Sequence, residues 1–253
     1  MSWSTFKALW LPARSQQLEW LDAEDLPVQA LQRNLDDLRW LNRYLGSHWL
    51  LCTALQRVWR QVGCPQHLRV LDIGTGAGDI PAVLRRWGKR RGVHVTVVAL
   101  DSQHRILQYM RSVYSHPPSI PCVQADGLCV PFRAQTFDIA MCSTMLHHLD
   151  WQQGIALLQS MAAVARYGVV VNDLVRSRLS YYAARLMLAL TACHAVTRHD
   201  GALSVLRAYS VGEVREMARL AGLAPVRVST ALGYRFVLVY RPPAREKVAA
   251  DGT

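Results

Sequence analysis

Apolar residues follow two different patterns along this chain. Near the start, leucines recur every three or four residues, which is the spacing of one face of an amphipathic helix: Leu31, Leu35, Leu38, Leu41 and Leu45. From residue 68 onward, short apolar runs alternate with longer amphipathic stretches. Such runs are typical of buried strands in a parallel sheet, and the stretches between them of the helices that cover it. The pattern predicts a helical front followed by an α/β unit.

The first 65 residues are predicted to be a helical extension packed on the core. Asp25 as a cap and Pro27 in the first turn are typical of a helix start. Gly46 and Ser47 separate this helix from a second one, which residues 63–65 (Gly-Cys-Pro) end. The apolar side of the second helix is predicted to carry Trp49, Leu55 and Trp59. A role for Asn42 or Arg43 in a site stays open.

Seven strands are predicted, at residues 68–73, 93–101, 120–124, 137–142, 168–171, 225–232 and 234–241. Asp150 is expected to cap a helix over 151–166, and Ser210 with Glu213 forms a capping box for a helix to about Ala221. Gly233 separates the last two strands as a hairpin. Residues 242–253 are predicted to be a flexible tail.

Residues 174–210 interrupt the alternation of strands and helices. The segment is too long for an ordinary connection of a few residues. We predict two helices that form a lid, with their junction at residues 199–201 (His-Asp-Gly).

Three glycines at alternate positions, Gly74, Gly76 and Gly78, follow the first strand, and a helix is expected after them, with Asp79 as its cap and Pro81 in its first turn. Glycine allows backbone to lie flat against a ligand. The dinucleotide pattern G-x-G-x-x-G fits poorly, because Asp79 stands where its third glycine belongs and a carboxylate disfavours a diphosphate. The P-loop pattern is absent. A generic glycine-rich turn stays an alternative.

An acid followed by G-x-G-x-G, as at 72–78, resembles motif I of class I S-adenosylmethionine-dependent methyltransferases. The Leu-His-His segment at 146–148 is similar to that of the small-molecule members related to quinone and polyketide methyltransferases. The resemblance covers about 68–241. It implies an α/β fold with a Rossmann-like, mostly parallel seven-stranded sheet, helices on both faces, an antiparallel C-terminal hairpin, and a domain at 66–241.

The resemblance implies S-adenosylmethionine as cofactor and S-adenosylhomocysteine as product, with no metal. In the family, the first acid lies near the methionyl end of the cofactor and the acid after the third strand faces adenine. An acid about 20 residues beyond the glycine turn, here Asp101, can bind ribose hydroxyls; capping the next helix is its alternative role. The expected cofactor-binding residues are Asp72, Gly74, Thr75, Gly76, Gly78, Asp101, Ser102, Asp126, Gly127, Cys142 and Ser143.

Ligands of open α/β sheets bind outside the carboxyl ends of the strands. His147 or His148 is therefore a candidate general base, with His148 preferred because a helix starting after Ser143 would turn it toward the lid. Asp173 is placed to orient the imidazole or to bind the acceptor. Core histidines, a capping Asp173 and catalysis by positioning alone stay as alternatives. Tyr181, Tyr182 and Arg207 of the lid are expected to bind the acceptor.

The expected reaction is O- or C-methylation of a phenolic, quinone-like or polyketide-type small molecule, because a lid rich in Tyr, Leu, Met and Ala suits an apolar acceptor. Enzymes that methylate base amines usually carry an Asn/Asp-Pro-Pro-aromatic segment where this chain has Ser-Thr-Met-Leu, at 143–146. Binding of the cofactor without methyl transfer, as a cyclase or a binding subunit, and RNA methylation stay as alternatives. Arginines in the lid keep an anionic acceptor open.

A net charge of +11 raises the question of nucleic-acid binding. The arginines are spread along the chain, however, and the densest run, 85–91, falls at the end of a predicted helix, where cations are favourable. A solvated helix end is favoured over an RNA or anionic-membrane contact, and a peripheral membrane contact stays open.

Six scattered cysteines without C-x-x-C predict reduced thiols in a cytoplasmic protein, with neither a zinc site nor disulfides. No secretory signal is recognisable at residues 1–15, and the apolar stretch 186–197 is shorter than the roughly 20 residues that span a membrane. A monomer or a homodimer is expected.

Overall fold

The computed structural model describes residues 13–23, 25–115 and 119–242. Their strands form one seven-stranded sheet in the order β3-β2-β1-β4-β5-β7-β6. The strands are β1 (His67–Ile73), β2 (His94–Asp101), β3 (Cys122–Gln124), β4 (Phe137–Ser143), β5 (Ala165–Leu174), β6 (Val226–Ala231) and β7 (Arg235–Tyr240). Neighbours pair in parallel except around β7, which runs antiparallel to β5 and β6. The predicted sheet and its C-terminal hairpin are confirmed.

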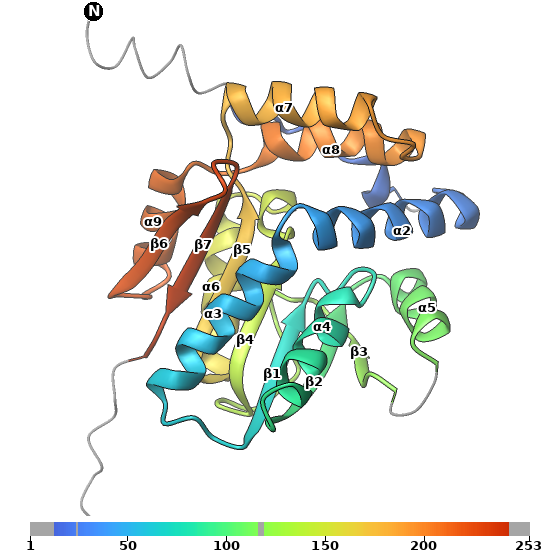
Figure 1. Cartoon of the computed structure of the whole chain (residues 1–253). Helices are drawn as coiled ribbons and strands as arrows, with labels where there is room; N and C mark the ends of the chain where they lie inside the picture. The colour runs from blue at the N-terminus through green and yellow to red at the C-terminus, as the bar shows by residue number, and fades with distance from the viewer. Residues whose placement is uncertain (1–12, 24, 116–118, 243–253) are drawn as a thin grey trace, which may run out of the picture.

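Helices cover both faces of this sheet (Figure 1). On one face, α3 (Ser47–Gln61) and α4 (Asp79–Lys89) pack on the sheet through residues such as Leu55 and Leu84, with α5 (His104–Val113) beside β2 and β3. On the other, α6 (Trp151–Val164) and α9 (Val211–Leu220) bury Leu157 and Met217 against Phe236. Apolar burial of this kind is the main stabilising contribution to such a fold.

Three more helices lie over the carboxyl ends of the strands (Figure 1): α2 (Val28–Tyr44), α7 (Arg178–Ala189) and α8 (Ala195–Arg207). Two short 3₁₀ turns, η1 (Trp20–Asp22) and η2 (Leu146–His148), contact α8.

The two helices predicted after the fifth strand are present as α7 and α8. Their junction lies at residues 190–194, so the prediction of a junction at 199–201 is wrong, because His199 and Asp200 are inside α8.

Helix starts were predicted with mixed success. Asp150 caps α6 and Ser210 forms a capping box with Glu213, as expected, and Asp150 also forms a capping box with Gln153. Asp25 is not a cap, since α2 begins at Val28 after Pro27 and makes no side-chain cap bond. Asp79 is not a cap either. Gly78 takes that position in the left-handed region at φ 75°, and the Asp79 carboxylate instead lies 2.6 Å from His48 Nε2.

Two further differences concern burial and length. Trp49 is 61% exposed, so it does not belong to the apolar side of α3, which Leu50, Leu51 and Leu55 form. Strand β5 extends beyond the predicted end to Leu174, because it pairs with β4 on one side and β7 on the other.

No helix among the described residues is long and apolar enough to cross a membrane. The predicted tail falls outside them, apart from Pro242.

Candidate active site

A cavity of about 680 Å³ opens at the carboxyl ends of β1, β2, β4 and β5. This volume is in the usual range of ligand sites, roughly 300–1,000 Å³. The glycine turn after β1 forms one wall, and α2, α7, α8 and η1 form the wall opposite. Much of that second wall is apolar, through residues such as Leu35, Leu38, Leu41, Met187 and Leu188.

The three glycines of the turn all have positive φ, at 67°, 52° and 75°, which favours glycine. A Cβ at Gly74 would lie 2.5 Å from Met145 Sδ, and one at Gly78 would lie 2.3 Å from Met110 Cγ. A Cβ at Gly76 would meet no protein atom within 4 Å. Packing therefore requires Gly74 and Gly78, whereas Gly76 borders open space in the cavity wall.

Asp101 lies at the end of β2 and fixes the same turn. Its Oδ2 accepts a hydrogen bond from the backbone N–H of Gly76 at 3.1 Å, and its Oδ1 accepts one from Gln103 at 3.1 Å. Burial raises the pKa of Asp101 despite these bonds. Each carboxylate oxygen has further acceptor capacity toward the cavity, so the side chain suits ligand hydroxyls.

Asp72 acts behind the turn rather than at the cavity. Its Oδ2 accepts the hydroxyl of Thr75 at 2.8 Å, and Thr75 lines the cavity. Burial, together with the charges of Asp79 and Asp101, raises the pKa of Asp72 to about 7 even though the Thr75 bond lowers it.

The predicted cofactor-binding residues thus fall into two groups. The cavity is lined by Gly74, Thr75, Gly76, Asp101, Ser102, Asp126, Gly127 and Ser143. The side chains of Asp72 and Cys142 are buried behind its wall, and Gly78 begins α4 beside Met110.

His147 and Asp173 form a buried pair at the ends of η2 and β5. His147 Nδ1 lies 2.7 Å from Asp173 Oδ1, and the His147 backbone N–H donates to Asp173 Oδ2 at 3.2 Å. Burial alone would raise the pKa of Asp173, but the charge and hydrogen bond of His147 outweigh it and hold that pKa below its usual value. The pair thus fixes the imidazole at the cavity, which His147 lines.

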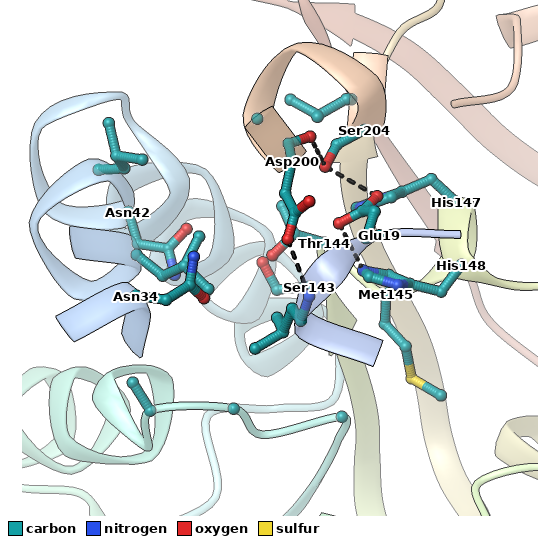
Figure 2. Close-up of a pocket in the computed structure, with 18 of the residues that line it drawn as sticks. Glu19, Asn34, Asn42, Ser143, Thr144, Met145, His147, His148, Asp200 and Ser204 are labelled. Carbon is teal, nitrogen blue, oxygen red and sulfur yellow. Dashed lines mark hydrogen bonds and ion pairs between the residues drawn. The ribbon is translucent and has the colours of Figure 1, made fainter. Parts of the chain in front are cut away.

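Residues 13–23, which we call the N-terminal strap, supply carboxylates that face both histidines. Figure 2 shows the Glu19 carboxylate beside the two imidazoles. Its oxygens lie 3.5 Å from His147 Nε2 and 3.7 Å from His148 Nε2, and Asp22 Oδ2 lies 3.0 Å from His148 Nδ1. Burial lowers the pKa of His148, but Glu19 and Asp22 together raise it to about 9. A protonated His148 is a poor base, which favours His147.

The strap is tied to α8. The backbone N–H groups of Trp20 and Leu21 donate to the two carboxylate oxygens of Asp200, each at 2.9 Å. The Trp20 ring stacks on His199 with centroids 3.9 Å apart. Ser204 donates its hydroxyl to Glu19 Oε1 at 2.9 Å (Figure 2). These bonds hold Glu19 in the site.

The residues predicted to bind the acceptor do not line the cavity: Tyr181, Tyr182 and Arg207. Arg207 is 4% exposed and donates to the backbone carbonyls of Gln17, His147 and His148, so it joins the strap to η2. Tyr182 is 64% exposed on the outer side of α7, and Tyr181 packs on it. The helix instead presents Ser180, Ala183, Ala184, Met187 and Leu188 to the cavity.

Sequence reasoning missed Glu19, Asp22 and Asn34, which all line the cavity. Glu19 and Asp22 lie in a segment without helical or strand periodicity, so no local pattern marks them. Asn34 had a usable signal, because it is a polar residue within the leucine stripe of α2. It is 1% exposed and donates to Thr197 Oγ1 at 3.0 Å.

Part of the chain matches a known protein family. Residues 70–168 match the family described as a methyltransferase domain. The matched stretch is less than half of the chain. It contains the glycine turn, Asp101, Asp126 and both histidines, but not the strap, Asp173, α7 or α8.

A curated relative and several solved structures are similar to this chain. The 2-phytyl-1,4-naphtoquinone methyltransferase of Thermosynechococcus vestitus is 37% identical over 92 residues, which are 34% of this chain and 40% of that protein. The match thus spans less than half the length of this curated relative.

Two solved structures show the same fold. A SAM-dependent methyltransferase from Aquifex aeolicus has a TM-score of 0.51 at 19% identity, over 74% of this chain and 88% of its own. The plantazolicin methyltransferase BpumL, solved in complex with S-adenosylhomocysteine (SAH), has a TM-score of 0.63 at 10% identity, over 85% and 95%. These two likenesses show that the described residues share the fold of those methyltransferases.

Proposed function

We propose that this chain transfers the methyl group of S-adenosylmethionine to a hydroxyl oxygen or a carbon of a small phenolic, quinone-like or polyketide-type acceptor. One observation carries the proposal: the glycine turn and His147, which Asp173 holds, line one cavity whose opposite wall is largely apolar. The partial likeness to a protein named as a naphthoquinone methyltransferase is in keeping with this acceptor class.

The cofactor is proposed to lie along the glycine turn, with its ribose hydroxyls on Asp101 and its adenine near Asp126. Both carboxylates border the cavity, and Gly76 leaves room for a ligand to approach the backbone. The carboxylates around the turn also suit a cofactor that carries a cationic sulfonium.

Methyl transfer is an in-line displacement. The acceptor oxygen forms a bond to the methyl carbon while the carbon–sulfur bond breaks, and its electron pair stays on sulfur, which gives S-adenosylhomocysteine. The acceptor hydroxyl must also lose its proton. His147, held by Asp173, is proposed to promote this loss, and binding in the cavity supplies proximity and alignment. Loss of the same proton activates a ring carbon for C-methylation.

Two measurements on the full chain test the proposal. Calorimetry with S-adenosylhomocysteine should show one site, and labelled S-adenosylmethionine should pass its label to members of a panel of hydroxynaphthalenes, quinols and alkylresorcinols. Binding without transfer to any member would favour a cofactor-binding protein. Label transfer to RNA, with affinity that falls steeply as salt rises, would favour the RNA alternative.

A further inference from the structure

Three atoms of the kind that bind metal ions converge where the strap meets η2. Glu19, His147 and His148 each offer one ligand atom, and these atoms lie within 4.8 Å of one another. The closest approaches to Glu19 are 3.5 Å and 3.7 Å. Ligand atoms about 2.0–2.1 Å from a tetrahedral zinc ion are about 3.3–3.4 Å apart. The two approaches to Glu19, one at each carboxylate oxygen, are therefore close to the spacing that such a site requires.

The opposite nitrogen of each imidazole is already held by a carboxylate. His147 Nδ1 lies 2.7 Å from Asp173 Oδ1, and His148 Nδ1 lies 3.0 Å from Asp22 Oδ2. Metal-binding histidines almost always donate their second N–H to such a partner, which fixes the tautomer and the ring orientation. This arrangement leaves both Nε2 atoms to face Glu19, and a bound ion would take the place of the proton that His148 otherwise carries there.

Glu19 is held in place from its other side. Its Oε1 accepts the Ser204 hydroxyl at 2.9 Å, and Arg207 Nε lies 3.7 Å away. All three candidate ligands line the cavity that the acceptor would enter. Among the residues that the structure describes, no second group of three such side chains comes together.

We propose that Glu19, His147 and His148 bind a divalent first-row transition ion such as Zn²⁺, and that this ion holds the acceptor oxygen. Two imidazoles with one carboxylate favour such an ion over Mg²⁺ or Ca²⁺, which prefer oxygen ligands alone. Three protein ligands leave a coordination position for the acceptor. Glu19 lies outside the stretch 70–168 that matches the methyltransferase family, so the inference depends on this chain's own residues.

The acceptor part of the inference rests on the proposed methyl transfer. A bound ion lowers the pKa of a coordinated hydroxyl, so the acceptor loses its proton to water and keeps its oxygen anion for attack on the methyl carbon. His147 would then promote ionisation as a ligand of the ion. The acceptor class narrows to phenols and enols, whose oxygen anions bind such ions.

The test uses Co²⁺ as a spectroscopic probe in the chelator-treated full chain, with Zn²⁺ in competition. Wild type should bind one Co²⁺ with visible absorption bands, and Zn²⁺ should displace it. Glu19→Gln and His148→Asn should each lose at least about ten-fold in affinity. Asp22→Ala, which removes only the outer partner of His148, should lose about 10- to 100-fold. Circular dichroism verifies the fold of each variant.

His67 and His94 provide a matched control. They start the neighbouring strands β1 and β2 at the opposite ends from the cavity, with ring centroids 5.7 Å apart. His94→Asn should leave Co²⁺ binding unchanged. Loss of binding in His94→Asn, equal binding by wild type and Glu19→Gln, or no binding by wild type would each overturn the proposal.

Calorimetry with S-adenosylhomocysteine on the same samples separates the two proposals. If the chain binds S-adenosylhomocysteine but no Co²⁺, the metal site is rejected and the proposed methyl transfer stands. If it binds Co²⁺ but no S-adenosylhomocysteine, the metal site stands and the proposed function fails. In the second case the bound ion has a role other than holding a methyl acceptor.

Discussion

His147 Nδ1 lies 2.7 Å from Asp173 Oδ1, and both side chains are at least 97% buried. The imidazole therefore keeps one orientation at the cavity wall. We predict that His147→Asn lowers turnover by about 10²–10⁴, the range for a group that acts on a transferred proton. Affinity for S-adenosylhomocysteine should not change. His104→Asn, at an exposed site beside Gln124, is the control, and equal turnover of the two variants would contradict the assignment.

Asp101→Asn should weaken S-adenosylmethionine binding by about 1–3 kcal/mol, the contribution of a hydrogen bond to a charged group. The variant keeps an oxygen for the Gly76 N–H but loses the bond from the Gln103 N–H, so circular dichroism should verify its fold. Titration calorimetry measures the loss, and unchanged affinity would remove Asp101 from the cofactor site.

Gly76→Ala should abolish cofactor binding, because a Cβ there meets no protein atom and would occupy space beside the ligand. Gly92→Ala is a matched control, since Gly92 also has positive φ, at 68°, and open space around it. Both variants should lose a similar stability of about 1–2 kcal/mol from backbone strain. Cofactor affinity should fall only in Gly76→Ala, and a parallel effect in both would reject the motif I interpretation.

Ala184→Phe should raise the acceptor's KM several-fold, because this residue faces the cavity from α7. Tyr182→Ala, two residues earlier and 64% exposed, should leave KM unchanged. These two expected results are the reverse of the sequence-based prediction, in which Tyr181 and Tyr182 bind the acceptor. A rise of KM in Tyr182→Ala alone would restore that expectation.

Asp72→Asn should change how stability depends on pH. The pKa of Asp72 is about 7 in the folded chain and about 3.9 when unfolded. The protonated group therefore supports full stability below about pH 4, and this contribution is lost as pH rises toward 7, by up to about 1.4 kcal/mol per unit. Urea unfolding at pH 5 and pH 8 should show a smaller decrease for Asp72→Asn than for wild type. Equal decreases would contradict the prediction.

The sheet was predictable because its signals are local. Short apolar runs, the glycine turn and two capping boxes each depend on neighbouring residues, and the structure contains all of them. Helix starts were less secure where only composition marked them, as at Asp25. The first turn of α2 has no side-chain cap, so nothing in the fold required one.

Only part of the cavity lining could be predicted from the sequence. Asp101 and His147 follow strands whose carboxyl ends meet at one edge, a rule that sequence order reveals. Glu19 reaches the same cavity from a segment without periodic pattern and is held by Ser204, 185 residues later. The tyrosines of α7 were assigned by their chemistry, but the facing side of a helix depends on what packs beneath it.

The strap has a consequence for how chains of this kind can diverge. The stretch 70–168 holds the glycine turn and both histidines, whereas the carboxylates that face those imidazoles come from residue 19, residue 22 and β5. Two proteins can therefore share this stretch almost unchanged and still perform different reactions. Replacing the N-terminal strap would change the carboxylates that face the two histidines. It would not disturb the groups proposed to hold the methyl donor. In this architecture, binding of the methyl donor and the reaction performed on the acceptor thus depend on separate segments of the chain.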